Sequence, residues 1–171
     1  MLYFAYGSNL HPLRLKARVP SAEFSGTGVL KGRRLAIHKR SWKDGSGKCD
    51  VPEAGSFEQV HGALFQISAA DRSTLAGIEG VGKGYEELAV RIESACGAVD
   101  AYLFRAQTDF IDPTLRPFDW YKALVLAGAV FHRFPEDYVA AIESVPSIVD
   151  PDEDRALENL ATVKMINPGA S

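Results

Sequence analysis

The chain has 171 residues, of which 46% are hydrophobic and 24% are charged, and its formal net charge is -3. This composition is typical of a globular protein with one core, and we expect a single domain over residues 1–171. The near-balanced charge argues against a nucleic-acid binder, which needs a basic face. The sequence has no apolar run of about 18 residues and no signal-peptide pattern, so we expect no membrane contact and a cytoplasmic protein.

The first predicted strand, over residues 2–6, leads into the turn Tyr6-Gly7-Ser8-Asn9-Leu10. Gly7 allows a positive φ and close approach of a ligand, while Ser8 and Asn9 add side-chain donors. Asn9 is a good N-cap, so a helix beginning here would add its dipole to the attraction of an anion. The turn therefore predicts a binding site for a small negative group. A plain structural connection is the alternative interpretation.

The remaining elements follow from periodicity and from turn residues. Strands are expected over residues 23–30, 33–39, 58–67, 84–93 and 98–104, with a long loop over 41–57. Helices are expected between a Ser68 cap and Gly80, and over 117–133, 135–145 and 152–161, with a short strand or tail after the last and frayed residues at 168–171. This order predicts an α+β fold in which a small mixed β-barrel or curled sheet is flanked by helices.

Cysteines and histidines show no pattern of metal or disulfide chemistry. Cys49 and Cys96 form no Cys-x-x-Cys pair, and we interpret the four histidines as structural or surface residues because they lack ligand spacing. We therefore expect no metal ion. A basic run from Lys31 to Lys43, which includes Lys39, lacks interleaved stacking aromatics and is interpreted as a solvated strand pair.

Glu79 is the acid with the most unfavourable predicted position. It lies between Ile78 and Val81 at the end of the helix that Gly80 terminates. The negative end of the helix dipole and apolar neighbours should both raise its pKa from about 4.3 towards about 6 to 7, which suits proton transfer at neutral pH. An exposed last-turn glutamate is the alternative.

Two further positions have polar side chains next to apolar segments. Glu86 shares a strand face with apolar residues and is a second candidate acid, with exposure at the strand end as its alternative. Tyr121 and Lys122 stand at the start of a predicted buried helix, where a phenol could reach a ligand.

Taken together, these motifs resemble the γ-glutamylcyclotransferase family. The resemblance rests on residues 3–10, on Glu79-Gly80-Val81 followed by Gly84-Tyr85, and on Tyr121-Lys122 with Gly128-Ala129. The glutathione-specific branch resembles this chain less, since it carries leucine at the position of Asn9. The γ-glutamylamine branch typically has threonine at the position of Ser8. The chain is therefore most similar to the branch that acts on γ-glutamyl amino acids.

The resemblance implies a cofactor-independent enzyme of the acyltransferase or lyase type. In its reaction the α-amine of a small γ-glutamyl substrate attacks its own side-chain amide carbonyl, which yields 5-oxoproline and an amino acid or amine. Glu79 would be the general acid/base. The residues implied to bind substrate are Tyr6, Gly7, Ser8, Asn9, Leu10, Tyr85 and Tyr121. The sequence leaves open whether the chain forms a homodimer.

Three alternatives to this function remain. The scaffold could serve as a non-catalytic domain that binds a small acid or a partner protein, or as a biosynthetic γ-glutamylamine cyclotransferase. A serine hydrolase using Ser8 is disfavoured, because the sequence has no Gly-x-Ser-x-Gly elbow around it. The loop over 41–57 and the pair Glu86-Glu87 match no family motif, so the leaving group stays undetermined.

Overall fold

A closed five-stranded barrel forms the centre of the computed structural model, which describes residues 2–167. Around the barrel the strands are β1 (Leu2–Ala5), β5 (Gln59–Gln66), β2 (Glu23–Lys31), β6 (Tyr85–Ser94) and β7 (Gly97–Ala106). Neighbours pair antiparallel except β1 and β7, which pair in parallel and close the barrel. The predicted mixed barrel flanked by helices is confirmed.

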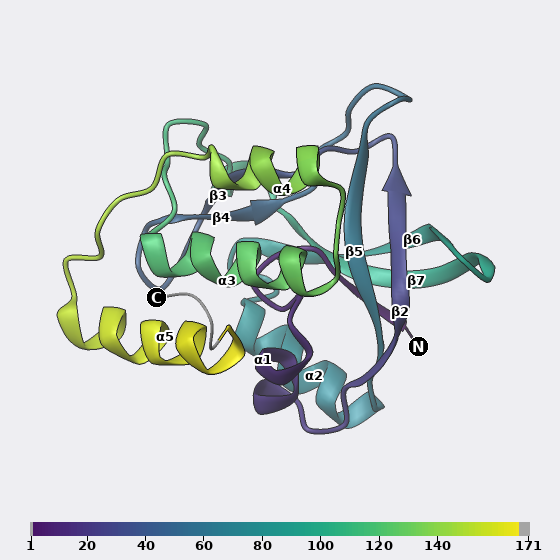
Figure 1. Cartoon of the computed structure of the whole chain (residues 1–171), viewed down its shortest axis with the longest axis horizontal. Helices are drawn as coiled ribbons and strands as arrows, with labels where there is room; N and C mark the ends of the chain where they lie inside the picture. Colours follow the sequence, from purple (N-terminus) through teal and green to yellow (C-terminus); the bar gives the residue numbers. More distant parts are fainter. Residues whose placement is uncertain (1, 168–171) are drawn as a thin grey trace.

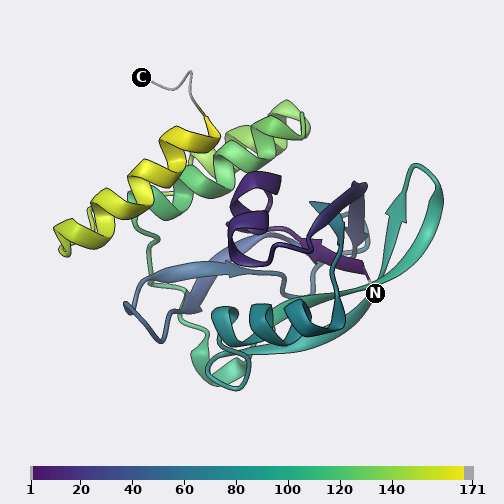
Figure 2. The ribbon, with the colours of Figure 1, turned by 90° about the horizontal axis from the view of Figure 1, so that it is seen from below.

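Helices cover the barrel from two sides. Helices α3 (Asp119–Phe131), α4 (Glu136–Glu143) and α5 (Glu153–Ile166) lie together on one side of the strands, and α2 (Ala69–Glu79) lies on the other (Figure 2). The short α1 (Pro12–Arg18) sits between the first group and the strands (Figure 2), and the β6–β7 hairpin extends away from the helices (Figure 1). Apolar side chains of barrel and helices share one core, in which Phe4, Phe65 and Leu124 are fully buried.

A second, two-stranded sheet pairs β3 (Ala36–Arg40) with β4 (Gly47–Asp50). The prediction of a loop over 41–57 is therefore wrong for β4, whose glycine and charged residues have weak strand preference. Tertiary contacts hold this strand in place. Asp50 Oδ1 accepts a hydrogen bond from the backbone N–H of Ala106 at 2.7 Å, and Asp50 Oδ2 lies 2.9 Å from His38 Nε2.

Local capping explains where the helices begin and end. Ser68 accepts a hydrogen bond from the Asp71 N–H, and Gly80 ends α2 in the left-handed region with φ of 80°, both as predicted. The predicted N-cap of α1 is wrong, because His11 and not Asn9 caps it, accepting from the Leu13 N–H.

The prediction for the C-terminal part of the chain is partly wrong and partly concerns residues that the structure does not describe. Helix α5 continues to Ile166, so the predicted strand or tail after residue 161 is also wrong. A single 3-10 turn, η1 (Thr108–Phe110), follows β7. The expected fraying at 168–171 lies outside the described residues. Within residues 2–167, no helix combines the length and apolar character needed to cross a membrane.

Candidate active site

The turn after β1 packs closely against β4 and α3. The Leu10 N–H donates to the Gly7 carbonyl at 3.1 Å, which closes the turn. The backbone φ of Gly7 is not positive, so the first of the two predicted reasons for this glycine is wrong. A Cβ at Gly7 would lie 3.1 Å from Cys49 Cβ and 3.5 Å from Tyr121 Oη, so the turn packs tightly against β4 at this glycine.

The same turn contains backbone N–H groups that donate no hydrogen bond within the described residues. Within residues 2–167, no hydrogen bond uses the backbone N–H groups of Gly7, Ser8 or Asn9. Buried backbone donors are normally satisfied, so three neighbouring free donors in residues that line a hollow suit an acceptor such as a carboxylate. Because α1 begins only at Pro12, these donors come from the turn itself and not from the first turn of a helix.

Glu79, the last residue of α2, points into the protein and not into bulk water. Its side chain is 18% exposed. Arg18 Nη1 donates to Glu79 Oε1 at 2.8 Å, and Asn9 Nδ2 donates to the same oxygen at 3.0 Å. Arg18 Nη1 also donates to Asn9 Oδ1 at 3.0 Å. These donors stabilise the charged carboxylate and oppose the destabilising effect of the helix C-terminus.

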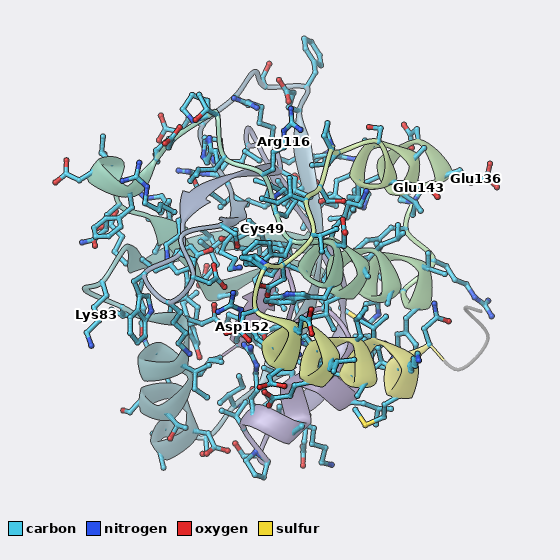
Figure 3. All side chains as sticks on the ribbon, turned by 90° about the vertical axis from the view of Figure 1, so that its left-hand side faces the viewer. Cys49, Lys83, Arg116, Glu136, Glu143 and Asp152 are labelled. Atoms are coloured by element: carbon cyan, nitrogen blue, oxygen red, sulfur yellow. The ribbon has the colours of Figure 1, made fainter. Side chains whose placement is uncertain are left out.

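Three buried phenols line the site: Tyr6 belongs to the turn itself, Tyr85 begins β6 and Tyr121 lies in α3. Tyr85 Oη donates to the Cys49 carbonyl at 2.5 Å, and Tyr121 Oη accepts from the Cys49 N–H at 3.0 Å. Tyr6 Oη donates to the Phe104 carbonyl. Burial raises the pKa of all three hydroxyls well above the ordinary value, so they stay protonated near neutral pH. Figure 3 shows Cys49, the shared partner of two of them, in the middle of the molecule.

Two adjoining hollows meet at these residues. The inner recess has a volume of about 20 Å³, room for one water-sized group, and is lined by Tyr3, Tyr6, Gly7, Ser8, Asn9, Cys49, Glu79, Tyr85, Phe104 and Tyr121. The outer chamber has a volume of about 210 Å³ and shares Ser8, Glu79, Tyr85 and Tyr121 with the recess. Glu79 therefore stands at the junction of the two hollows. Leu10 lines neither, but its carbonyl lies 2.8 Å from His132 Nε2, which fixes the turn to the end of α3.

Known proteins share both sequence and fold with this chain. The AIG2-like family matches residues 59–142. Proteins named γ-glutamylcyclotransferase from Bos taurus and Homo sapiens are 27% and 26% identical over 149 and 153 residues, which cover 84% of this chain and 78% of each relative. A solved structure titled γ-glutamyl cyclotransferase superposes with a TM-score of 0.81 at 22% identity, covering 96% of this chain and 98% of that one. The chain is therefore similar in sequence and in fold to proteins named γ-glutamylcyclotransferase.

The same fold also matches part of a longer protein. YkqA from Bacillus subtilis superposes with a TM-score of 0.70 at 22% identity, covering 86% of this chain and 56% of that one. The barrel with its flanking helices is therefore also present within a longer protein. This likeness concerns the fold alone.

Sequence reasoning missed a buried lysine at this site. Lys39 belongs to the basic run interpreted as solvated, yet it is only 1% exposed and lines the outer chamber. Its ammonium lies 4.1 Å from the centroid of the Tyr85 ring. Burial lowers the pKa of Lys39 to about 8, and the nearby Glu79 carboxylate opposes this shift. No local signal distinguishes Lys39 from its exposed neighbours Arg40 and Lys43.

Two other candidate site residues, Glu86 and Lys122, lie away from the hollows. Arg105 Nη2 donates to Glu86 Oε1 at 2.6 Å, and the Glu86 side chain is 43% exposed, so the strand-surface interpretation is confirmed. Lys122 Nζ donates to the carbonyls of Glu143 and Val145 at the end of α4. Among residues 2–167, no group of three or more His, Cys, Asp or Glu side chains is arranged to hold a metal ion.

Proposed function

We propose that this protein catalyses the γ-glutamylcyclotransferase reaction. The α-nitrogen of a γ-glutamyl compound attacks its own side-chain carbonyl carbon, a C–N bond forms in a five-membered ring, and the original amide C–N bond breaks. The products are 5-oxoproline and a free amine. The position of Glu79, held by Asn9 and Arg18 between the two hollows, carries this proposal. The relatives named γ-glutamylcyclotransferase support the general assignment.

The substrate supplies its own nucleophile, so the protein needs no covalent intermediate. Oriented intramolecular attack reaches effective molarities on the order of 10⁵ to 10⁸ M. The main task of the site is to hold the γ-glutamyl group in a bent conformation. The buried rings of Tyr85 and Tyr121 form a rigid wall for this purpose.

Proton transfer is the second requirement, and we assign it to Glu79. The α-amine is an ammonium with a reference pKa of about 8, so it must lose a proton before it attacks and another after the bond forms. The leaving nitrogen gains two protons and departs as an ammonium. A charged carboxylate at the junction of recess and chamber can accept protons from one nitrogen and return them to the other.

Donors for negative charge are the third requirement. The free N–H groups of Gly7, Ser8 and Asn9 can bind the α-carboxylate of the substrate or the oxygen that becomes negative during attack. The Tyr121 hydroxyl accepts from Cys49 and keeps its own proton for donation into the recess.

The variant Glu79→Gln tests this proposal. We expect release of 5-oxoproline from γ-glutamyl dipeptides to fall by about 10² to 10⁴-fold, the contribution typical of a general acid/base. Glu86→Gln is the matched control, because Glu86 lies on the surface and lines neither hollow. Circular dichroism and calorimetric titration with 5-oxoproline verify that Glu79→Gln is folded and binds product. Wild-type turnover in Glu79→Gln would remove Glu79 from the mechanism.

A further inference from the structure

The outer chamber is strongly cationic. Two carboxylates line it, those of Asp44 and Glu79, against six basic side chains: Arg14, Arg18, Lys39, Lys43, Lys48 and Arg155. Such an excess in a concave, partly buried site attracts negatively charged ligands.

Four of the six cations already have partners or contact solvent. Arg18 pairs with Glu79 at 2.8 Å, Lys48 with Asp44 at 3.0 Å and Arg155 with Asp150 at 2.5 Å. Lys43 is exposed and lies over the ring of Trp42. These four cations therefore need no ligand to balance them.

Lys39 and Arg14 differ from the other four. Lys39 is 1% exposed and Arg14 is 7% exposed. Within residues 2–167, neither side chain makes a hydrogen bond or an ion pair, and Arg14 Nε is buried without a partner. A buried cation is costly unless an anion compensates it, so this arrangement is suited to a ligand that brings negative charge.

The absence of a side chain at Gly84 leaves room for the Lys39 side chain. A Cβ at Gly84 would lie 2.8 Å from Lys39 Cε and 3.0 Å from its Nζ, and Gly84 has a φ of 119° that other residues rarely adopt. The lysine therefore passes directly over a glycine of the segment that joins α2 to β6. Contact with the face of Tyr85 positions its ammonium at the wall shared by the two hollows.

We propose that Lys39 and Arg14 bind the carboxylates of the leaving group, and that the preferred substrates are γ-glutamyl conjugates of a dicarboxylic amino acid. This inference rests on the proposed function. The turn donors and Glu79 engage the γ-glutamyl half at the mouth of the recess, with one small group of it inside, so the leaving nitrogen faces the outer chamber. Two uncompensated cations there match two carboxylates. A neutral or cationic amine would leave both cations buried and unpaired.

The test compares γ-glutamylglutamate with γ-glutamylglutamine, which differ only in a side-chain carboxylate against an amide. We expect the wild type to favour the first by about tenfold or more in kcat/KM, as truncating a buried charge pair typically costs that much. In Lys39→Met and Arg14→Met this ratio should fall towards one. Lys16→Met, which removes an exposed charge of α1 outside the chamber, should keep the wild-type ratio. A wild-type ratio near one, or an unchanged ratio in both chamber variants, would overturn the inference.

Failure of the proposed function is distinguishable from failure of this inference. If the wild type releases no 5-oxoproline from either dipeptide, the cyclotransferase proposal fails. Calorimetric titration of both dipeptides into wild type and Lys39→Met then shows whether the chamber binds the side-chain carboxylate through Lys39. Tighter binding of γ-glutamylglutamate that depends on Lys39 supports the carboxylate subsite, and equal affinities exclude it.

Discussion

The amide of Asn9 donates to the Glu79 carboxylate at 3.0 Å, across 70 positions of sequence. This bond joins the turn after β1 to the end of α2, and Arg18 braces it by donating to both side chains. Asn9 Nδ2 also lies 3.3 Å from the hydroxyl of Tyr3, within hydrogen-bond distance. The turn over residues 6–10 and the proposed acid/base are therefore parts of one hydrogen-bonded unit.

We expect Asn9→Leu to lower kcat by about 10- to 100-fold, because a hydrogen bond to a charged group is worth about 1.5–3 kcal/mol. Glu79 keeps Arg18 but loses the amide that fixes its position against the turn. The measurement is steady-state release of 5-oxoproline, with kcat and KM determined separately. Gln66→Leu, which removes an exposed amide at the end of β5, is the control and should match the wild type. An unchanged kcat in Asn9→Leu would show that Glu79 needs no such positioning.

Much of the fold could be predicted because its signals are local. Strands β5, β6 and β7 lie within two residues of their predicted bounds, and α2 begins and ends at its predicted caps. Strand β4 could not be predicted in this way. Its residues have weak strand preference, and contacts from β7 and from Tyr85 and Tyr121 determine its conformation.

The residues of the candidate site also fall into two groups: those with a local sequence signal and those without one. Glu79 and the turn over residues 6–10 are unusual in their own sequence neighbourhoods, and the structure brings them together. Lys39 and Arg14 lie among other basic residues and have no distinguishing local pattern. Contacts of Lys39 with Tyr85 and Gly84, and of α1 with α5, place these two side chains beside the chamber. A charged residue whose burial depends on tertiary packing leaves no signature in the local sequence.

Close packing of α3 on the turn predicts a steric effect at Gly128. A Cβ there would lie 2.3 Å from Leu10 Cβ and 3.1 Å from the His11 nitrogen. We expect Gly128→Ala to destabilise the protein by about 1–3 kcal/mol, as overpacking usually does. In α2, a Cβ at Gly77 meets nothing within 4 Å, so Gly77→Ala should stabilise by about 0.4–1 kcal/mol. Urea unfolding measures both, and equal effects of the two variants would contradict this account.

The Cys49 backbone gives a second stability prediction. Tyr121→Phe removes the acceptor of the buried Cys49 N–H, and an unsatisfied buried donor costs about 1–3 kcal/mol. We expect a melting temperature lower by several degrees in differential scanning fluorimetry. Tyr138→Phe is the matched control, since its hydroxyl makes only a long 3.5 Å contact to the His61 carbonyl, and it should change little. Similar losses in both variants would mean that β4 does not depend on this bond.

The pKa of Lys39 makes a pH dependence testable. Burial lowers this pKa from 10.5 to about 8, against the carboxylates of Glu79, Asp44 and Asp50 and together with the charge of Lys48. The ammonium is therefore lost as pH rises through about 8 in the free enzyme. We expect the preference for γ-glutamylglutamate over γ-glutamylglutamine to fall over the same range, measured as the ratio of kcat/KM from pH 6.5 to 9.5. The two dipeptides share the reacting α-amine, so its own titration cancels in the ratio.

The lowered pKa of Lys39 also makes the free energy of unfolding depend on pH. Between pH 8 and 10.5 the unfolded chain retains the Lys39 proton while the folded chain has released it. The unfolded state then binds more protons, so the Lys39 contribution to the free energy of unfolding increases as pH rises through this window. In Lys39→Met the selectivity ratio should become independent of pH. The stability of this variant relative to wild type should be greatest at and below about pH 8 and should fall towards pH 10.5. A selectivity ratio that still falls in Lys39→Met would assign the titration to another group.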